Sequence, residues 1–128
     1  MIIIKTKLKE SLIHPDGIGL FTDVFVNKGQ VVILPSSVGL DIELDKTKFN
    51  QLRKEEQDFI SHYGFLNKFN NKYHLNFDNA RFINHSIDSN LTLDVSTSCL
   101  GAKRNIEIGE ELTQDYSEFE ILRSDLIK

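Results

Sequence analysis

The first third of the chain sets short apolar runs between glycine-containing turns. Residues 2–7 mix β-branched residues with lysines, and residues 18–26 again favour a strand. Turn-forming residues occupy positions 15–17 and 27–29. Residues 30–34 form one more apolar run, which ends at a proline because proline has no backbone N–H to offer to a sheet. The pattern predicts three short strands in this part of the chain.

Apolar residues then recur at a helical spacing. A helix is expected to begin near Asp45 or Thr47, either of which is a suitable N-cap, and to end at Gly64. Its apolar face consists of Phe49, Leu52, Phe59, Ile60 and Tyr63. The positions between them carry charge and would face solvent. One amphipathic helix is therefore predicted.

The second half of the chain returns to an alternation with a period of two. Residues 72–77, 91–95 and 98–104 each predict a strand. Residues 117–120 have the Ser-x-x-Glu form of a capping box, so residues 119–126 are expected to form a short closing helix. The predicted fold class is mainly β (α+β), with one or two helices.

Composition and charge narrow the class of protein. With 128 residues, 40% of them hydrophobic, the chain is expected to form one core and one domain over residues 1–128. The formal net charge of −4 argues against sequence-independent binding to nucleic acid and favours a cationic partner. Cys99 is the single cysteine, which predicts a reducing compartment and no cysteine-built zinc site. Because the N-terminus shows neither a signal peptide nor a membrane span, a cytoplasmic location is expected, with a host compartment left open.

Three strings of residues carry the candidate chemistry. One is Arg81-Phe82-Ile83-Asn84-His85-Ser86, and another is Glu110-Glu111-Leu112-Thr113-Gln114-Asp115-Tyr116. A third, weaker string is Gly17-Ile18-Gly19-Leu20-Phe21. It is not a dinucleotide-binding fingerprint, since the third glycine would fall at Thr22 and no strand-to-helix unit follows. In this order the three strings closely resemble the motifs of the SET-domain protein lysine methyltransferases, in particular small stand-alone members of bacterial or viral type.

The resemblance implies a fold, a cofactor and a set of binding residues. The fold would consist of small curved sheets in which the C-terminal segment forms a pseudoknot beside the Asn-His pair. The cofactor would be S-adenosylmethionine, bound by Ile18, Gly19, Leu20, Arg81, Phe82, Asn84, His85 and Tyr116. Tyr116 is also the expected catalytic residue, because the matching tyrosine of the family lines the point where methyl donor and lysine meet. Outside this context, Asn84 and His85 would be assigned to a capped loop and Tyr116 to a buried tyrosine with a satisfied hydroxyl.

A channel for the substrate lysine is implied at three positions. Tyr63 resembles the aromatic segment that lines this channel in the family, although it fits the apolar face of the predicted helix equally well. Gln114 stands two positions before Tyr116, where many relatives carry a Phe or Tyr that limits the number of methyl groups. The methylation state is therefore left open. Phe119 would cover the cofactor or the channel, or would anchor the last helix.

Other chemistry is less well supported by the sequence. The histidines are scattered without a ligand spacing, so no metal site is expected. Glu110 and Glu111 are interpreted as a solvated turn instead of a paired acid site, because neighbours on a strand point to opposite faces.

Two functions from different classes follow. The first is a protein-lysine N-methyltransferase, similar to histone-lysine methyltransferases, that acts on a lysine-containing protein or peptide. Docking of that substrate would use a homodimer or the bare surface of one chain. The alternative is a non-catalytic SET-fold module that recognises a cationic protein partner, since a fold does not dictate a function.

Overall fold

The computed structural model describes residues 1–36 and 39–120. In this part of the chain the strands are β1 (Thr6–Glu10), β2 (Ile18–Thr22), β3 (Val31–Ile33), β4 (Ile42–Leu44), β5 (Phe65–Leu66), β6 (Tyr73–Leu75), β7 (Asn84–His85), β8 (Leu91–Asp94), β9 (Cys99–Ala102) and β10 (Thr113–Gln114). The helices are α1 (Lys46–Asn50), α2 (Lys54–Tyr63) and the 3₁₀ helices η1 (Asn79–Phe82) and η2 (Tyr116–Glu118). The predicted mainly β class is confirmed.

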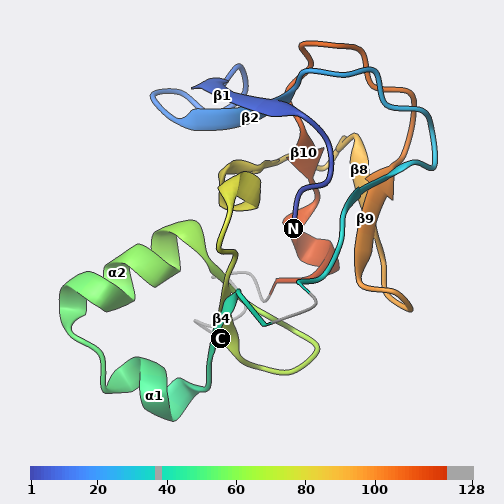
Figure 1. Cartoon of the computed structure of the whole chain (residues 1–128). Helices are drawn as coiled ribbons and strands as arrows, with labels where there is room; N and C mark the ends of the chain where they lie inside the picture. Colours follow the sequence, from blue (N-terminus) through green and yellow to red (C-terminus); the bar gives the residue numbers. More distant parts are fainter. Residues whose placement is uncertain (37–38, 121–128) are drawn as a thin grey trace.

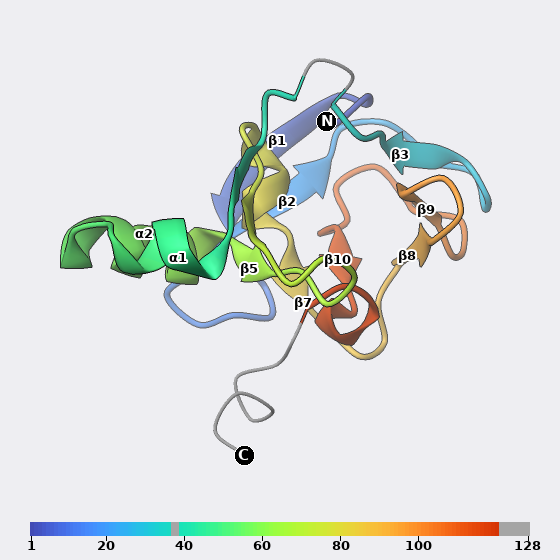
Figure 2. The same cartoon turned by 90° about the horizontal axis from the view of Figure 1, so that it is seen from below.

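The strands form four small sheets. Strands β1 and β2 pair antiparallel, and the orders β3-β9-β8 and β4-β6-β5 make two antiparallel sheets of three strands. Figure 1 shows β1 and β2 at the top, β8 and β9 on the right, and the two helices at the lower left. Strand β10 pairs with β7 in parallel, and Figure 2 shows this pair between the helices and β8–β9. Residues 113–114 thus return to the Asn-His segment.

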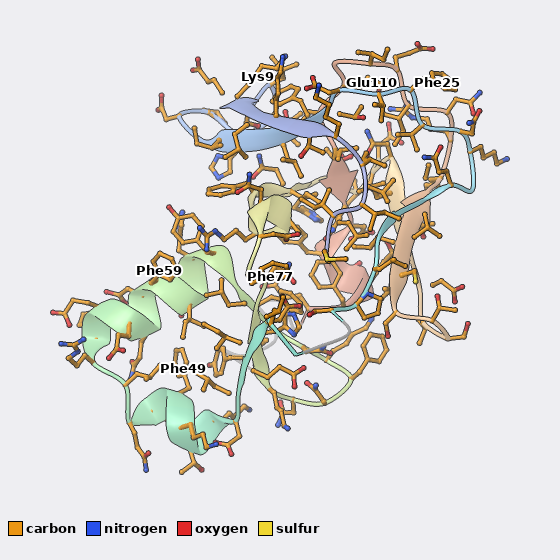
Figure 3. The ribbon with its side chains drawn as sticks, viewed as in Figure 1. Lys9, Phe25, Phe49, Phe59, Phe77 and Glu110 are labelled. Carbon is orange, nitrogen blue, oxygen red and sulfur yellow. The ribbon has the colours of Figure 1, made fainter. Side chains whose placement is uncertain are left out.

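Buried apolar residues form one main cluster and one smaller cluster. The main cluster contains Leu20, Val26, Val32, Ile33, Ala80, Ile83, Leu91, Ala102, Ile106 and Leu112. The smaller cluster joins Phe49, Ile60 and Leu75, with Tyr63 and Tyr73 packed against it. In the smaller cluster the rings of Phe49 and Tyr73 stack at 3.8 Å between centroids, and Figure 3 shows Phe49 between the two helices. Ile83 of the first cluster and Tyr63 beside the second both border a small cavity.

The single amphipathic helix predicted after Asp45 is wrong, because two helices occupy that stretch. The expected N-cap at Asp45 is confirmed, since its side chain accepts a hydrogen bond from the amide of Lys48 at 2.8 Å. Helix α1 ends at Asn50, and beyond it the Gln57 side chain donates to the carbonyls of Phe49 and Leu52, both at 3.1 Å. These bonds satisfy carbonyls that a continuous helix would have bonded internally.

The expected end of the helix at Gly64 is confirmed, but its reason is tertiary. A Cβ at this position would lie 2.4 Å from the backbone carbonyl oxygen of His74. Glycine therefore allows α2 to approach β6 closely. Tyr63 and Phe65, the two sequence neighbours of Gly64, both line the small cavity. The closing helix predicted for residues 119–126 falls mostly outside the described residues, and the preceding turn is the 3₁₀ helix η2.

Candidate active site

Asn84 joins the three sequence strings in space. Its Nδ2 donates to the carbonyl of Ile18 at 3.0 Å, to Oε2 of Glu111 at 3.0 Å and to Oγ of Ser11 at 3.2 Å. Within the described part of the chain, Oδ1 of Asn84 accepts no hydrogen bond. Since an amide oxygen has two lone pairs, this atom is free to accept a bond from a ligand. The Asn-His segment, the glycine turn and the final string therefore meet at one side chain.

Glu111 is buried at this junction, so the expectation of a solvated turn is wrong for it. The residue is 8% exposed, and its carboxylate also accepts hydrogen bonds from Oγ of Ser11 and the amide of Leu12, both at 2.8 Å. Only its neighbour Glu110 behaves as predicted: it lies near the surface and pairs with Arg104 at 3.0 Å. A buried carboxylate is stable here because three donors surround it.

The glycine turn is shaped by this carboxylate. A Cβ at Gly19 would lie 2.5 Å from Oε2 of Glu111, so the missing side chain makes room for a protein group, whereas the sequence suggested room for a ligand. Ile18 is 48% exposed. Leu20 has its side chain fully buried and its carbonyl bonded to the amide of Leu112 at 2.8 Å. Cofactor contacts at these three residues stay predictions, and those of Leu20 are limited to its backbone.

Two hydrogen bonds fix Tyr116 against the Asn-His segment. Its backbone amide donates to Nδ1 of His85 at 3.0 Å, and its hydroxyl donates to the carbonyl of Ile83. The His85 and Tyr116 rings lie 5.2 Å apart. Because Nδ1 of His85 accepts a bond, its proton resides on Nε2 in the neutral ring, and 43% of the side chain is exposed.

The environment of Tyr116 keeps its phenol protonated. Burial raises the pKa of Tyr116 to about 12, and the negative charge of Glu120 acts in the same direction. Burial disfavours the phenolate because a charge loses its hydration in a low dielectric. At neutral pH the hydroxyl is therefore a hydrogen-bonding group and not a base.

A small cavity brings the predicted channel residues together. Its volume is about 50 Å³, and Tyr63, Gln114, Tyr116 and Phe119 all line it. The Tyr116 and Phe119 rings lie 5.6 Å apart, and Phe119 meets the ring of Phe65 edge-on at 4.7 Å. A larger open groove of about 780 Å³ adjoins this cavity and shares Phe65, Asn76, Gln114 and Phe119 with it. Aromatic rings thus form part of the cavity wall where it meets the groove.

Arg81 faces helix α2. Its guanidinium lies over the rings of Phe82, Tyr63 and Phe59, at 5.3, 5.8 and 5.9 Å. Its buried Nε has no hydrogen-bond partner among the described residues. Phe82 in turn packs edge-on against Tyr63 at 5.7 Å. Arg81 and Phe82 therefore hold Tyr63 beside the cavity, and their cofactor contacts stay predictions.

Ser11 escaped the sequence reasoning, because it lies 100 positions from Glu111 and nothing in its local sequence marks it. Asn90 is 2% exposed and ties β10 down through bonds to Thr113 and to the carbonyl of Glu111 at 2.8 Å. A signal did exist for Glu111, because strand alternation sends it to the face opposite Glu110.

Among residues 1–36 and 39–120, no group of three or more His, Cys, Asp or Glu side chains is placed to hold a metal ion. No helix in that part of the chain has the length and apolar character needed to cross a membrane.

Comparison with known proteins agrees with this arrangement. The family model of the SET domain matches residues 17–117. A search of curated proteins found no match. Solved structures are similar in fold: ctPRC2 in an autoinhibited conformation bound to S-adenosylmethionine has a TM-score of 0.65 and 21% identity, over 95% of this chain and 16% of that chain.

Two further structures give the same result. A humanized mutant of the Chaetomium thermophilum Polycomb Repressive Complex 2, bound to an inhibitor, has a TM-score of 0.64 and 20% identity over 91% of this chain and 15% of that chain. An active polycomb repressive complex 2 in the basal state has a TM-score of 0.63 and 22% identity, over 88% and 15%. At these identities the likeness concerns the fold, and this chain spans only about one sixth of each protein.

Proposed function

This chain belongs to the SET domain family, and we propose that it is a protein-lysine N-methyltransferase that moves a methyl group from S-adenosylmethionine to a lysine side chain. The observation that carries the proposal is the position of the aromatic-walled cavity. Tyr116 lines this cavity, and its hydroxyl donates a hydrogen bond to the carbonyl of Ile83. Ile83 directly precedes Asn84, whose side chain contacts the glycine turn at Ile18. A lysine in the cavity and a cofactor at Asn84 would thus lie on two sides of one short backbone segment.

The residues around Asn84 suit S-adenosylmethionine. Oδ1 of Asn84 accepts no bond within the described chain, Ile18 is half exposed, and the proton-bearing Nε2 of His85 offers a donor. This mixed set of polar groups fits a nucleoside with an amino-acid tail. When bound, the cofactor would supply a methyl group activated by the positive charge on sulfur. Ile18, Gly19, Asn84 and His85 would hold it, with Arg81 and Phe82 supporting the substrate side.

The cavity would prepare the substrate lysine for attack. An exposed lysine has a pKa of about 10.4 and is protonated at neutral pH, which leaves no lone pair for attack. Loss of hydration between the rings of Tyr63 and Phe119 disfavours the ammonium form and opposes the attraction of the Glu120 carboxylate, which also lines the cavity. The protonated phenol of Tyr116 donates to Ile83, so its oxygen can accept an N–H of the amine and orient it. The amine proton would leave to solvent before attack, and no residue is assigned as a general base.

The substrate class follows from charge as well as from the cavity. The chain carries a formal net charge of −4, which favours a lysine-bearing, cationic protein segment. A homodimer that completes the docking surface remains part of the proposal. Light scattering at working concentrations tests it, and a monomeric mass would remove the dimer.

Calorimetric titration with S-adenosylmethionine tests the cofactor site without a known substrate. We expect one-site binding that Asn84→Ala abolishes, because the variant loses both Oδ1 and the contact to Ile18. Asn50→Ala, at the exposed end of α1, is the matched control and should bind as the wild type does. Circular dichroism must show that both variants are folded. Absence of binding by the folded wild type would contradict the proposed cofactor.

Transfer of labelled methyl groups to a library of lysine peptides tests the chemistry. Tyr116→Phe removes only the hydroxyl, so we expect unchanged cofactor binding and a loss of turnover of about a hundredfold, typical of a misoriented reacting group. Tyr73→Phe is the control, since Tyr73 stacks on Phe49 away from the cavity. Turnover that survives Tyr116→Phe would count against the mechanism. Cofactor binding without any transfer would favour the non-catalytic module.

A further inference from the structure

The large groove beside the cavity has an apolar wall and a polar wall. The apolar wall includes Leu93 and Leu100, which pair across β8 and β9. The polar wall includes the carboxylates of Asp41 and Glu43. In the part of the chain that the structure describes, no lysine or arginine lines the groove, and the α-ammonium group of Met1, which also lines it, already donates to a backbone carbonyl. The groove therefore offers negative charge beside an apolar surface.

His74 lies between the two acidic side chains. Its Nε2 is 3.0 Å from Oδ2 of Asp41 and 3.2 Å from Oδ1 of Asn76. Because both neighbours are acceptors, Nε2 carries the proton of the neutral ring and Nδ1 is left as an acceptor. Nδ1 is buried and has no hydrogen-bond partner among the described residues. Since Oε1 of Glu43, 3.5 Å away, is an acceptor too, two acceptors face each other without a donor.

The Glu43 carboxylate is the acceptor that a ligand can reach. Asp41 is already engaged, because its Oδ1 accepts a hydrogen bond from the amide of Phe77 at 3.0 Å and its Oδ2 faces His74. Nothing in the described chain donates a hydrogen bond to the Glu43 side chain, which lines the groove and is 47% exposed. A cationic N–H group that entered the groove would meet this carboxylate, with Nδ1 of His74 directly behind it.

A cross-strand row links Glu43 to the cavity. Phe65 pairs with His74 and His74 pairs with Glu43, so the three residues stand side by side on β5, β6 and β4. Their side chains share one face of the sheet, since the rings of Phe65 and His74 stack at 5.0 Å. Phe65 lines the cavity. Because neighbouring strands lie about 4.8 Å apart, Glu43 stands about 10 Å from this part of the cavity wall.

We propose that Glu43 forms a subsite for a basic side chain of the substrate, so that the enzyme selects proteins with an arginine or lysine two or four positions from the methylated lysine. The proposal rests on the proposed function and deepens it by naming the substrate class. An extended segment advances about 3.3 Å per residue, so 10 Å spans about three residues. Side chains on one face of such a segment are two or four positions apart, and a long basic side chain covers the difference.

Peptide binding tests this subsite without any methyl transfer. The probes are short alanine peptides with norleucine, a linear apolar residue, at the centre and one arginine two, three or four positions away on either side. Matched peptides carry citrulline, which keeps the length of arginine without its charge. Dissociation constants are measured by fluorescence polarisation. At two or four positions on one side, we expect arginine to bind about two- to fivefold more tightly than citrulline, as for one half-exposed ion pair.

Three variants identify the group that selects. Glu43→Gln keeps the size of the side chain and removes its charge, so the preference for arginine should disappear. Glu107→Gln, at an exposed position outside the groove, should retain the preference. Glu43→Lys should reverse it, so that peptides with glutamate at the same position bind more tightly than peptides with arginine. Circular dichroism must show that each variant is folded.

Four results would overturn the proposal. They are equal affinities for arginine and citrulline at every position, a preference that survives Glu43→Gln, and no peptide bound by the folded wild type. The fourth is a ¹⁵N spectrum of the free chain with protons on both ring nitrogens of His74, because Glu43 would then already have a donor.

Kinetics give a second readout when lysine replaces norleucine at the centre of the same peptides. Arginine at the preferred position should lower KM and leave kcat unchanged, and Glu43→Gln should remove this effect, because the subsite binds ground state and transition state equally. A change in kcat alone would indicate a structural effect and count against the subsite. Arginine selection without methyl transfer would contradict the proposed function but support the subsite.

Discussion

Replacing the buried Glu111 by glutamine should loosen the site while leaving its shape intact. The carboxylate accepts hydrogen bonds from the Leu12 amide and Ser11 Oγ at 2.8 Å and from Asn84 Nδ2 at 3.0 Å. Glutamine keeps the size but turns one oxygen into an NH₂ donor. If that group replaces Oε1, it faces the Leu12 amide, and if it replaces Oε2, it faces the Asn84 amide.

The magnitude follows from these contacts. One hydrogen bond to a charged group contributes about 1.5–3 kcal/mol, and the remaining bonds weaken when the charge is gone, so we expect a loss of about 2–4 kcal/mol in the free energy of unfolding. For a domain of this length that corresponds to a fall of roughly 10 °C in the melting temperature. S-adenosylmethionine affinity should fall as well, because the side chain of Asn84 and the turn at Ile18 lose a shared anchor.

Thermal unfolding followed by circular dichroism is the assay, with Glu107→Gln as the matched control. Glu107 is exposed, so the free energy of unfolding of Glu107→Gln should lie within about 0.5 kcal/mol of the wild-type value. A double-mutant cycle with Asn84→Ala should show a coupling of about 0.5–3 kcal/mol between the two side chains. A melting temperature of Glu111→Gln equal to that of Glu107→Gln, or additive effects in the cycle, would refute the role given to this carboxylate.

Three other perturbations have defined outcomes. Gly64→Ala should lower the free energy of unfolding by about 1–3 kcal/mol in denaturant titration, because its Cβ would lie 2.4 Å from the His74 carbonyl oxygen; an unchanged free energy would contradict the close packing of α2 on β6. Phenolate absorbance should show Tyr116 titrating with a pKa of about 12. Since this value lies above the usual 10.0, the stability that the protonated Tyr116 contributes is fully present below pH 10 and is lost as the pH rises towards 12. Tyr116→Phe should remove this part of the pH dependence. The hydrogen bond from Arg104 lowers the pKa of Glu110, so its stabilisation is present above the ordinary carboxyl pKa and is lost as the pH falls through the lowered value. Glu110→Gln should flatten acid unfolding, and an identical acid profile would count against the ion pair.

The helical region shows where prediction from pattern stops. Asp45 was recognised as an N-cap and Gly64 as the end of the helical stretch, because each is a local signal. The interruption between α1 and α2 was not predicted, because apolar residues keep a helical spacing across it. The side chain of Gln57 stabilises the break by bonding to carbonyls five and eight residues earlier, and Glu56 caps the start of α2 by accepting a bond from the Arg53 amide.

The residues predicted to line the channel lie close together in space, but their contacts were not foreseen. Tyr63, Gln114, Tyr116 and Phe119 were named from the resemblance, and the structure gathers them around one cavity. The direction of Arg81 was not foreseen, because stacking on α2 depends on where that helix packs. Cofactor contacts are not tested by this arrangement and stay predictions.

The sequence by itself determined the mainly β class, the turns and the three strings of site residues, because alternation, turn chemistry and short motifs are properties of neighbouring residues. Tertiary structure alone decided that Glu111 is buried and that Gly19 makes room for it. These features depend on contacts such as that between Ser11 and Glu111, 100 positions apart. A side chain's hydrogen-bond partners at such a separation are set by how the sheets pack, which local sequence does not encode.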